Sequence, residues 1–131
     1  MTEARKQLES LFAAFNRGDI PTVIASVAEE CTLRGSLAPG LPYSGVFKGA
    51  QGAGQYFSGI AEALAPNGVD VDLYVSEGEH VVAVGSWSDI AKASGKPFKS
   101  PLALYFRFRN GKMIDFRGHE DTGVTLAAMR S

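Results

Sequence analysis

Cysteine and histidine are scarce in this sequence. It contains one cysteine, Cys31, and two histidines, His80 and His119, which are far apart in the chain. One cysteine excludes an internal disulfide. The cysteine and the two histidines do not have the spacing that is typical of metal ligands. The glycine-rich run at residues 49–54 lacks the Gly-Lys-Ser/Thr ending of a phosphate loop, so it more simply starts a helix. We therefore expect neither a metal nor a cofactor.

An excess of charge of one sign is also missing. The 131 residues carry 13 basic and 14 acidic side chains, for a formal net charge of −1. This balance argues against nucleic acid or a polybasic membrane surface as a partner. No apolar run approaches the roughly 20 residues of a membrane helix, and no apolar core follows the basic pair Arg5-Lys6 as it would in a secretory leader. The expectation is a single cytoplasmic domain over residues 1–131, long enough to bury its own core.

Helical periodicity is present in several segments. Apolar residues recur at i, i+3, i+4 and i+7 in residues 2–17, and the same spacing follows Asp19. Gly18 is placed to end the first helix, and Asp19 is a suitable N-cap for the second. A third helix is predicted over residues 49–64 and a short closing helix over residues 122–129.

Strand patterns occupy most of the remaining chain. Short strands are predicted at residues 31–34 and 46–48, and longer ones at 69–76 and 80–91, before a hairpin within residues 100–121. In the first long strand, alternation predicts one buried face, made of Val69, Val71, Leu73 and Val75. The order of elements predicts helices segregated onto one face of a mainly antiparallel sheet, which is an α+β fold.

The hairpin sets the register of the sheet. A three-residue loop over residues 109–111, with Gly111 in the left-handed conformation, would place Phe106 opposite Ile114 and Leu104 opposite Phe116. One face would then be continuously apolar. The opposite face would consist of Tyr105, Arg107, Met113, Asp115, Arg117 and His119. This mixed outer surface is suited to a homodimer interface with a polar rim.

Five segments, taken in order, resemble a known family. They are FAAFNRGD at residues 12–19, LPYSGVFKG at 41–49, SGKPF at 94–98, FRFRNGKMI at 106–114 and HEDT at 119–122. The chain resembles the nuclear transport factor 2-like superfamily in its SnoaL-like and ketosteroid-isomerase-like branch. The resemblance implies a cone-shaped curved sheet wrapped around three N-terminal helices, an apolar pocket inside, and a homodimer in most members.

Fold alone does not give function in this superfamily, so the catalytic positions are compared one by one. The resemblance places the oxyanion tyrosine of steroid isomerases at Leu11 and their general base at Gly35. It places the second acidic group, or the histidine of cyclases, at Leu104, and a late-strand aspartate at Gly118. Steroid isomerisation by the known set of residues is therefore not expected.

Two carboxylates remain as acid/base candidates. The epoxide hydrolases of the superfamily carry an Arg-x-Asp motif where this chain reads Trp87-Ser88-Asp89, so the carboxylate is retained and the arginine is not. In a pocket beside Trp87, Asp89 would have a raised pKa; the alternative is a strand-end residue in solvent. Glu120 shares the parity of Phe116 and Gly118, and its alternative is a place on the rim.

Two functions are consistent with these residues. The first is cofactor-free acid/base isomerisation, cyclisation or hydration of a small hydrophobic molecule, with Asp89 as first candidate and Glu120 as second. The alternative is a non-catalytic, dimeric ligand-binding module, which the loss of the four acid/base positions favours. In either case the predicted ligand-binding residues are Tyr43, Tyr56, Phe57, Trp87, Phe106, Phe116 and Gly118.

Overall fold

Four helices form where the sequence predicts them. A computed structural model describes residues 2–65 and 68–130. The helices are α1 (Glu3–Asn16), α2 (Ile20–Ala25), α3 (Gly49–Ala63) and α4 (Thr122–Met129). The Asp19 side chain accepts a hydrogen bond from the Thr22 amide, and Asp121 caps α4 in the same way. Gly18 has a φ of 79°, the left-handed conformation that ends α1.

The strands form one mixed sheet. They are β1 (Val27–Arg34), β2 (Val46–Lys48), β3 (Leu64–Ala65), β4 (Val69–Glu77), β5 (His80–Ala91), β6 (Pro97–Arg109) and β7 (Lys112–Glu120). Their order is β2-β1-β7-β6-β5-β3, with β4 also paired to β5. Strands β1 and β7 are parallel and the other pairs are antiparallel. Compared with the prediction, β1 and β6 start earlier, and β3 was not predicted.

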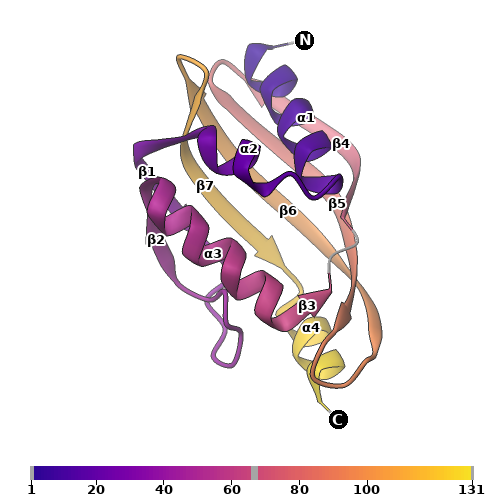
Figure 1. The fold of residues 1–131 in the computed structure, drawn as a ribbon. Coiled ribbons are helices and arrows are strands. Elements are labelled where there is room, and N and C mark those ends of the chain that lie inside the picture. Colours follow the sequence, from indigo (N-terminus) through magenta and orange to yellow (C-terminus); the bar gives the residue numbers. More distant parts are fainter. Residues whose placement is uncertain (1, 66–67, 131) are drawn as a thin grey trace.

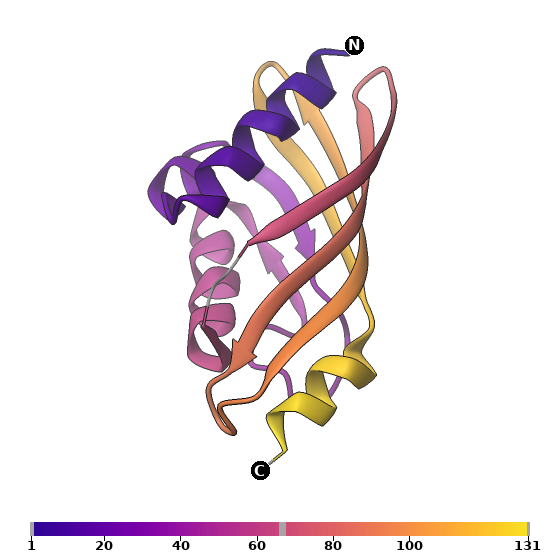
Figure 2. The same ribbon diagram turned by 90° about the vertical axis from the view of Figure 1, so that its right-hand side faces the viewer.

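The sheet curls strongly into a half-barrel. Helices α1, α2 and α3 lie on its concave side, and α4 lies at the end of the sheet near the C-terminus (Figures 1 and 2). Buried side chains from this concave side and from the helices form a single core, with Leu8 and Phe12 from α1 and Phe106 from β6 among them. The predicted α+β fold is confirmed.

The register of the β6–β7 hairpin differs from the prediction. Asn110 and Gly111 have φ angles of 51° and 78°, and they form a two-residue turn because Arg109 pairs with Lys112. Two left-handed residues in sequence suit the primed turns that match strand twist. A bulge follows: the register shifts between Arg107 and Phe108, which leaves Ile114 as the extra residue. Phe106 therefore lies opposite Phe116, and the predicted three-residue loop is wrong.

Bulges also change which side chains face the core. Met113 was predicted on the outer face, but it is 3% exposed and packs inside. In β4 the register shifts between Val71 and Leu73, which turns the rest of that strand over. Leu73 and Val75 were predicted to be buried and are instead 54% and 57% exposed. The outer face of the sheet is therefore more apolar around β4 than the alternation pattern predicted.

Candidate functional site

A cavity lies between the helices and the concave face of the sheet. The space open to the centre of a water molecule is about 70 Å³, whereas one water needs roughly 10–15 Å³ by this measure. The cavity can therefore hold a small organic molecule in place of several waters. Of the predicted ligand-binding residues, those that line it are Tyr56, Phe57, Trp87, Phe106, Phe116 and Gly118. Tyr43 does not line the cavity.

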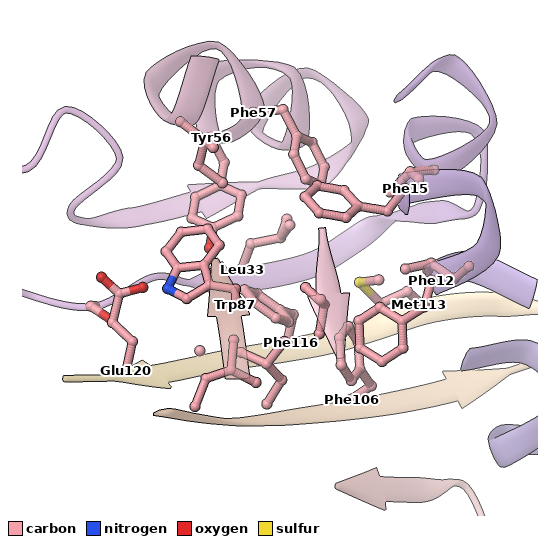
Figure 3. A pocket seen from close by; sticks show the side chains of 18 of the residues that line it. Phe12, Phe15, Leu33, Tyr56, Phe57, Trp87, Phe106, Met113, Phe116 and Glu120 are labelled. Atoms are coloured by element: carbon pink, nitrogen blue, oxygen red, sulfur yellow. The ribbon is translucent and has the colours of Figure 1, made fainter. Parts of the chain in front are cut away.

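Aromatic rings make up much of the wall (Figure 3). Phe15 from α1 meets Phe57 from α3 at a centroid distance of 6.0 Å. On the sheet, Phe106 packs on Phe116 at 5.1 Å and against the edge of Phe12 at 5.8 Å. These contacts hold the rings in place, so this part of the cavity offers a ligand a fixed apolar surface.

The other end of the cavity is polar because Glu120, the last residue of β7, reaches it. The buried Tyr43 hydroxyl donates a hydrogen bond of 2.8 Å to Glu120 Oε1. Burial raises the pKa of Glu120; the Tyr43 hydrogen bond opposes this shift, and the charge of the nearby Asp89 adds to it. The pKa values of Tyr43 and Tyr56 are also raised, mainly by burial and further by the charge of Glu120. Both hydroxyls therefore remain protonated donors.

Trp87 supplies a second donor at this end. Its side chain is 5% exposed, and its Nε1–H finds no acceptor among the described residues. Leaving a buried donor unsatisfied costs about 1–3 kcal/mol. Figure 3 shows the Trp87 ring nitrogen turned toward the Glu120 end of the pocket.

Asp89 lies beside the cavity, not in its wall. It is 3% exposed on the inward face of β5, so the alternative of a solvated strand-end residue is wrong. It is nevertheless absent from the cavity lining, which Glu120 reaches. Of the two candidate carboxylates, Glu120 is therefore the one that a molecule in the cavity would touch.

The four positions that the resemblance assigned to acid/base groups lie in or beside the cavity wall. Leu11, Leu104 and Gly118 do line the cavity, as apolar or absent side chains. At Gly35, an added Cβ would lie 2.8 Å from the Tyr43 carbonyl oxygen and 2.9 Å from Tyr56 Cε1. The ring of Tyr56 and the backbone at Tyr43 thus occupy the space that a base at position 35 would need.

Sequence reasoning missed the link between Tyr43 and Glu120. The two residues are 77 positions apart, and Tyr43 belongs to a segment between β1 and β2 that has no periodicity. Trp87 was predicted as a wall residue, but its unsatisfied N–H depends on what surrounds it. Both features are tertiary, and no local pattern could have shown them.

Metal-binding clusters and membrane-spanning helices are both absent from the part of the chain that the structure describes. Within residues 2–65 and 68–130, no group of three His, Cys, Asp or Glu side chains could hold a metal ion. In that same part of the chain, no helix has the length and apolar character needed to cross a membrane.

Comparison with known proteins identifies relatives by sequence pattern and by structure. A family model described as the SnoaL-like domain matches residues 8–116. A search of curated proteins finds no match to the sequence.

Three solved structures illustrate the structural likeness. An NTF2-like protein of unknown function from Burkholderia pseudomallei has a TM-score of 0.91 at 21% identity, with 100% of each chain covered. A protein of ketosteroid isomerase-like fold from Catenulispora acidiphila, in complex with trimethylamine, has 0.78 at 15%, with 94% of this chain and 91% of that one covered. A proposed SnoaL-like polyketide cyclase from Shewanella putrefaciens has 0.80 at 12%, with 98% and 97% covered. At these identities the likeness shows a shared fold.

Proposed function

The chain belongs to the SnoaL-like domain family, and from that premise we propose that its cavity carries out cofactor-free acid/base chemistry on a small, largely apolar molecule. Isomerisation, cyclisation and hydration all need a proton to be moved at one atom of the substrate. Glu120 is the group proposed to move it. The observation that carries the proposal is a half-buried carboxyl of raised pKa, oriented by Tyr43, at one end of an aromatic cavity.

The surroundings of Glu120 favour this role. A general acid or base works best when its pKa lies near the working pH, and burial moves the pKa of Glu120 in that direction. The hydrogen bond from Tyr43 to Oε1 fixes the orientation of the carboxyl group. Asp89, the first candidate from sequence, is proposed to act on Glu120 through its charge, because it does not line the cavity.

A proton-exchange assay tests the proposal without knowledge of the natural substrate. The probe is 2-tetralone, a bicyclic ketone with acidic hydrogens beside its carbonyl. In D₂O, a carboxylate base removes one of these protons to give the enolate. The protonated carboxyl group exchanges its proton with D₂O and then returns a deuteron to the enolate carbon. We expect the protein to accelerate this exchange, followed by NMR, and Glu120→Gln to lower the accelerated rate by about a hundredfold.

Glu62→Gln is the matched control, since Glu62 lies exposed on α3. It removes a carboxylate without touching the cavity, and it should keep the wild-type exchange rate. Retention of the accelerated rate by Glu120→Gln would rule out Glu120 as the proton carrier.

The second candidate function is ligand binding without chemistry. It is favoured by the apolar or absent side chains at Leu11, Leu104 and Gly118, which face the cavity where relatives are expected to carry acid/base groups. In that case 2-tetralone would bind with no accelerated exchange, and Glu120→Gln would bind it as well as wild type.

A further inference from the structure

The indole N–H of Trp87 is a donor without an acceptor at the wall of the cavity. The ring lines the cavity and is 5% exposed, and no acceptor for Nε1 exists among the described residues. A buried polar group of this kind normally has a partner. Because no acceptor among the described residues meets this N–H, it is available to an acceptor on a bound ligand.

Packing fixes the direction of this donor. Tyr43 meets the Trp87 ring edge-on at a centroid distance of 6.1 Å and an angle of 89°, and Phe98 meets it at 6.4 Å and 88°. The backbone at Trp87 is paired to Val69 on one side and Ser100 on the other. The N–H is therefore held in one orientation before any ligand arrives, which reduces the entropy lost on binding.

The rest of the site restricts the chemistry of the ligand. A donor pairs with an acceptor, so a ligand ammonium group, which has no lone pair, does not satisfy it. Glu120 at the same end of the cavity would repel a ligand carboxylate when it is ionised. The aromatic wall formed by Phe57, Phe106 and Phe116 suits an apolar body.

We propose that Trp87 is a specificity-determining residue whose indole N–H binds a neutral acceptor oxygen, such as a ketone carbonyl, of an otherwise apolar ring compound. This inference rests on the proposed use of the cavity as a binding site, but not on proton transfer by Glu120. Ligands of the same skeleton without the oxygen leave the N–H unsatisfied and bind less well for that reason.

The test is a binding cycle with two probes of one skeleton, 2-tetralone and its hydrocarbon tetralin. Dissociation constants are measured by displacement of a hydrophobic dye for wild type and for Trp87→Phe, which keeps a ring but has no N–H. We expect Trp87→Phe to weaken 2-tetralone about three- to tenfold more than it weakens tetralin. Equal weakening of the two probes would overturn the proposal.

Phe57→Leu is the matched control, because it alters the apolar wall without removing a donor. It should weaken both probes by the same factor, within about twofold, since both lose the same apolar contact. A selective loss of ketone binding in Phe57→Leu would overturn the assignment to Trp87.

A second measurement uses the wild-type protein and does not depend on the folding of a variant. Trp87 is the single tryptophan, so its indole N–H gives one resonance in a ¹⁵N-labelled sample. Saturation with 2-tetralone should move this proton resonance downfield, and saturation with tetralin should not. A resonance that responds equally to both probes contradicts the proposal, whatever the outcome of the exchange assay on Glu120.

Discussion

At the scale of single residues, burial and neighbouring side chains determine the protonation of Glu120. Burial raises the pKa of Glu120, the Tyr43 hydroxyl lowers it, and Asp89 raises it. A carboxyl whose pKa is raised by folding binds its proton more tightly in the native state than in the unfolded chain. The free energy of unfolding therefore falls as pH rises from about 4.5, the ordinary glutamate value, through the native pKa.

Removing either neighbour should shift this pH window, in opposite directions. Tyr43→Phe removes the hydrogen bond that favours the ionised form, so the pKa of Glu120 should rise and the fall in stability should extend to higher pH. Asp89→Asn removes a repelling charge, so the pKa should drop and the fall should end at lower pH. Urea unfolding from pH 4 to 9, with Glu120→Gln as the non-titrating reference, measures both shifts.

Tyr105→Phe provides the matched control for this pair. The Tyr105 hydroxyl also has one side-chain partner, His80 Nδ1 at 2.6 Å, but on the outer face of the sheet. Its loss should leave the pH window of Glu120 unchanged. Shifts of the same sign in Tyr43→Phe and Asp89→Asn would contradict the opposite effects of these two residues on the pKa of Glu120.

At the scale of elements, the close pairing of β4 with β5 depends on Gly85. A Cβ at this position would lie 1.9 Å from the Asp70 carbonyl oxygen and 2.9 Å from Val71 Cα. Both obstacles are backbone, immediately before the bulge in β4, so neither can move aside alone. We expect Gly85→Ala to lower the free energy of unfolding by about 2–3 kcal/mol, measured by chemical denaturation.

Gly54→Ala is the corresponding control in α3. An added Cβ there meets nothing within 4 Å, and Gly54 is a helix-interior residue. This variant should be more stable than wild type by about 0.5–1 kcal/mol, because alanine loses less backbone freedom in a helix. Equal effects of the two substitutions would mean that the β4–β5 contact is not tight.

The sequence predicted helices better than registers for a physical reason. The boundary at Gly18 and Asp19 depends on local caps, and the caps are visible in the sequence. The bulges at Asp72 and Ile114 arise from the coiling of the whole sheet, which local alternation does not contain. The predicted register of β7 was wrong by two residues, an even number, and so Phe116 was still placed facing inward.

At the scale of the whole molecule, the outer face of the sheet has an apolar patch formed by Leu73, Val75, Val82 and Val84. Leu73 pairs with Val84 and Val75 with Val82 across β4 and β5. Ion pairs join Arg107 and Arg109 to Glu79 beside the patch. Further along the sheet, on β1 and β7, Arg34 and Arg117 pair with Asp115. An apolar centre with a polar, charged rim suits a two-fold contact with a second copy.

We propose a homodimer through this outer face, centred on the apolar patch and not on the β6–β7 surface predicted from the sequence. Leu73→Lys combined with Val75→Lys should convert a dimer into a monomer in sedimentation equilibrium at micromolar concentration. Leu37→Lys is the control, because Leu37 is 73% exposed but lies between β1 and β2. A monomeric wild type under the same conditions would contradict the proposal.

The single extra residue at Ile114 has a consequence for how this protein can change by insertion and deletion. If the turn stayed at two residues and Ile114 were paired regularly, without the bulge, Phe106 would lie opposite Asp115 and Leu104 opposite Arg117. Two charged side chains would then enter the aromatic wall, and Glu120 would point outward to the solvent. Deletion of Ile114 itself would only remove the bulge and keep Phe106 opposite Phe116, so this position can lose its residue without exchanging the chemistry of the two faces of the strand.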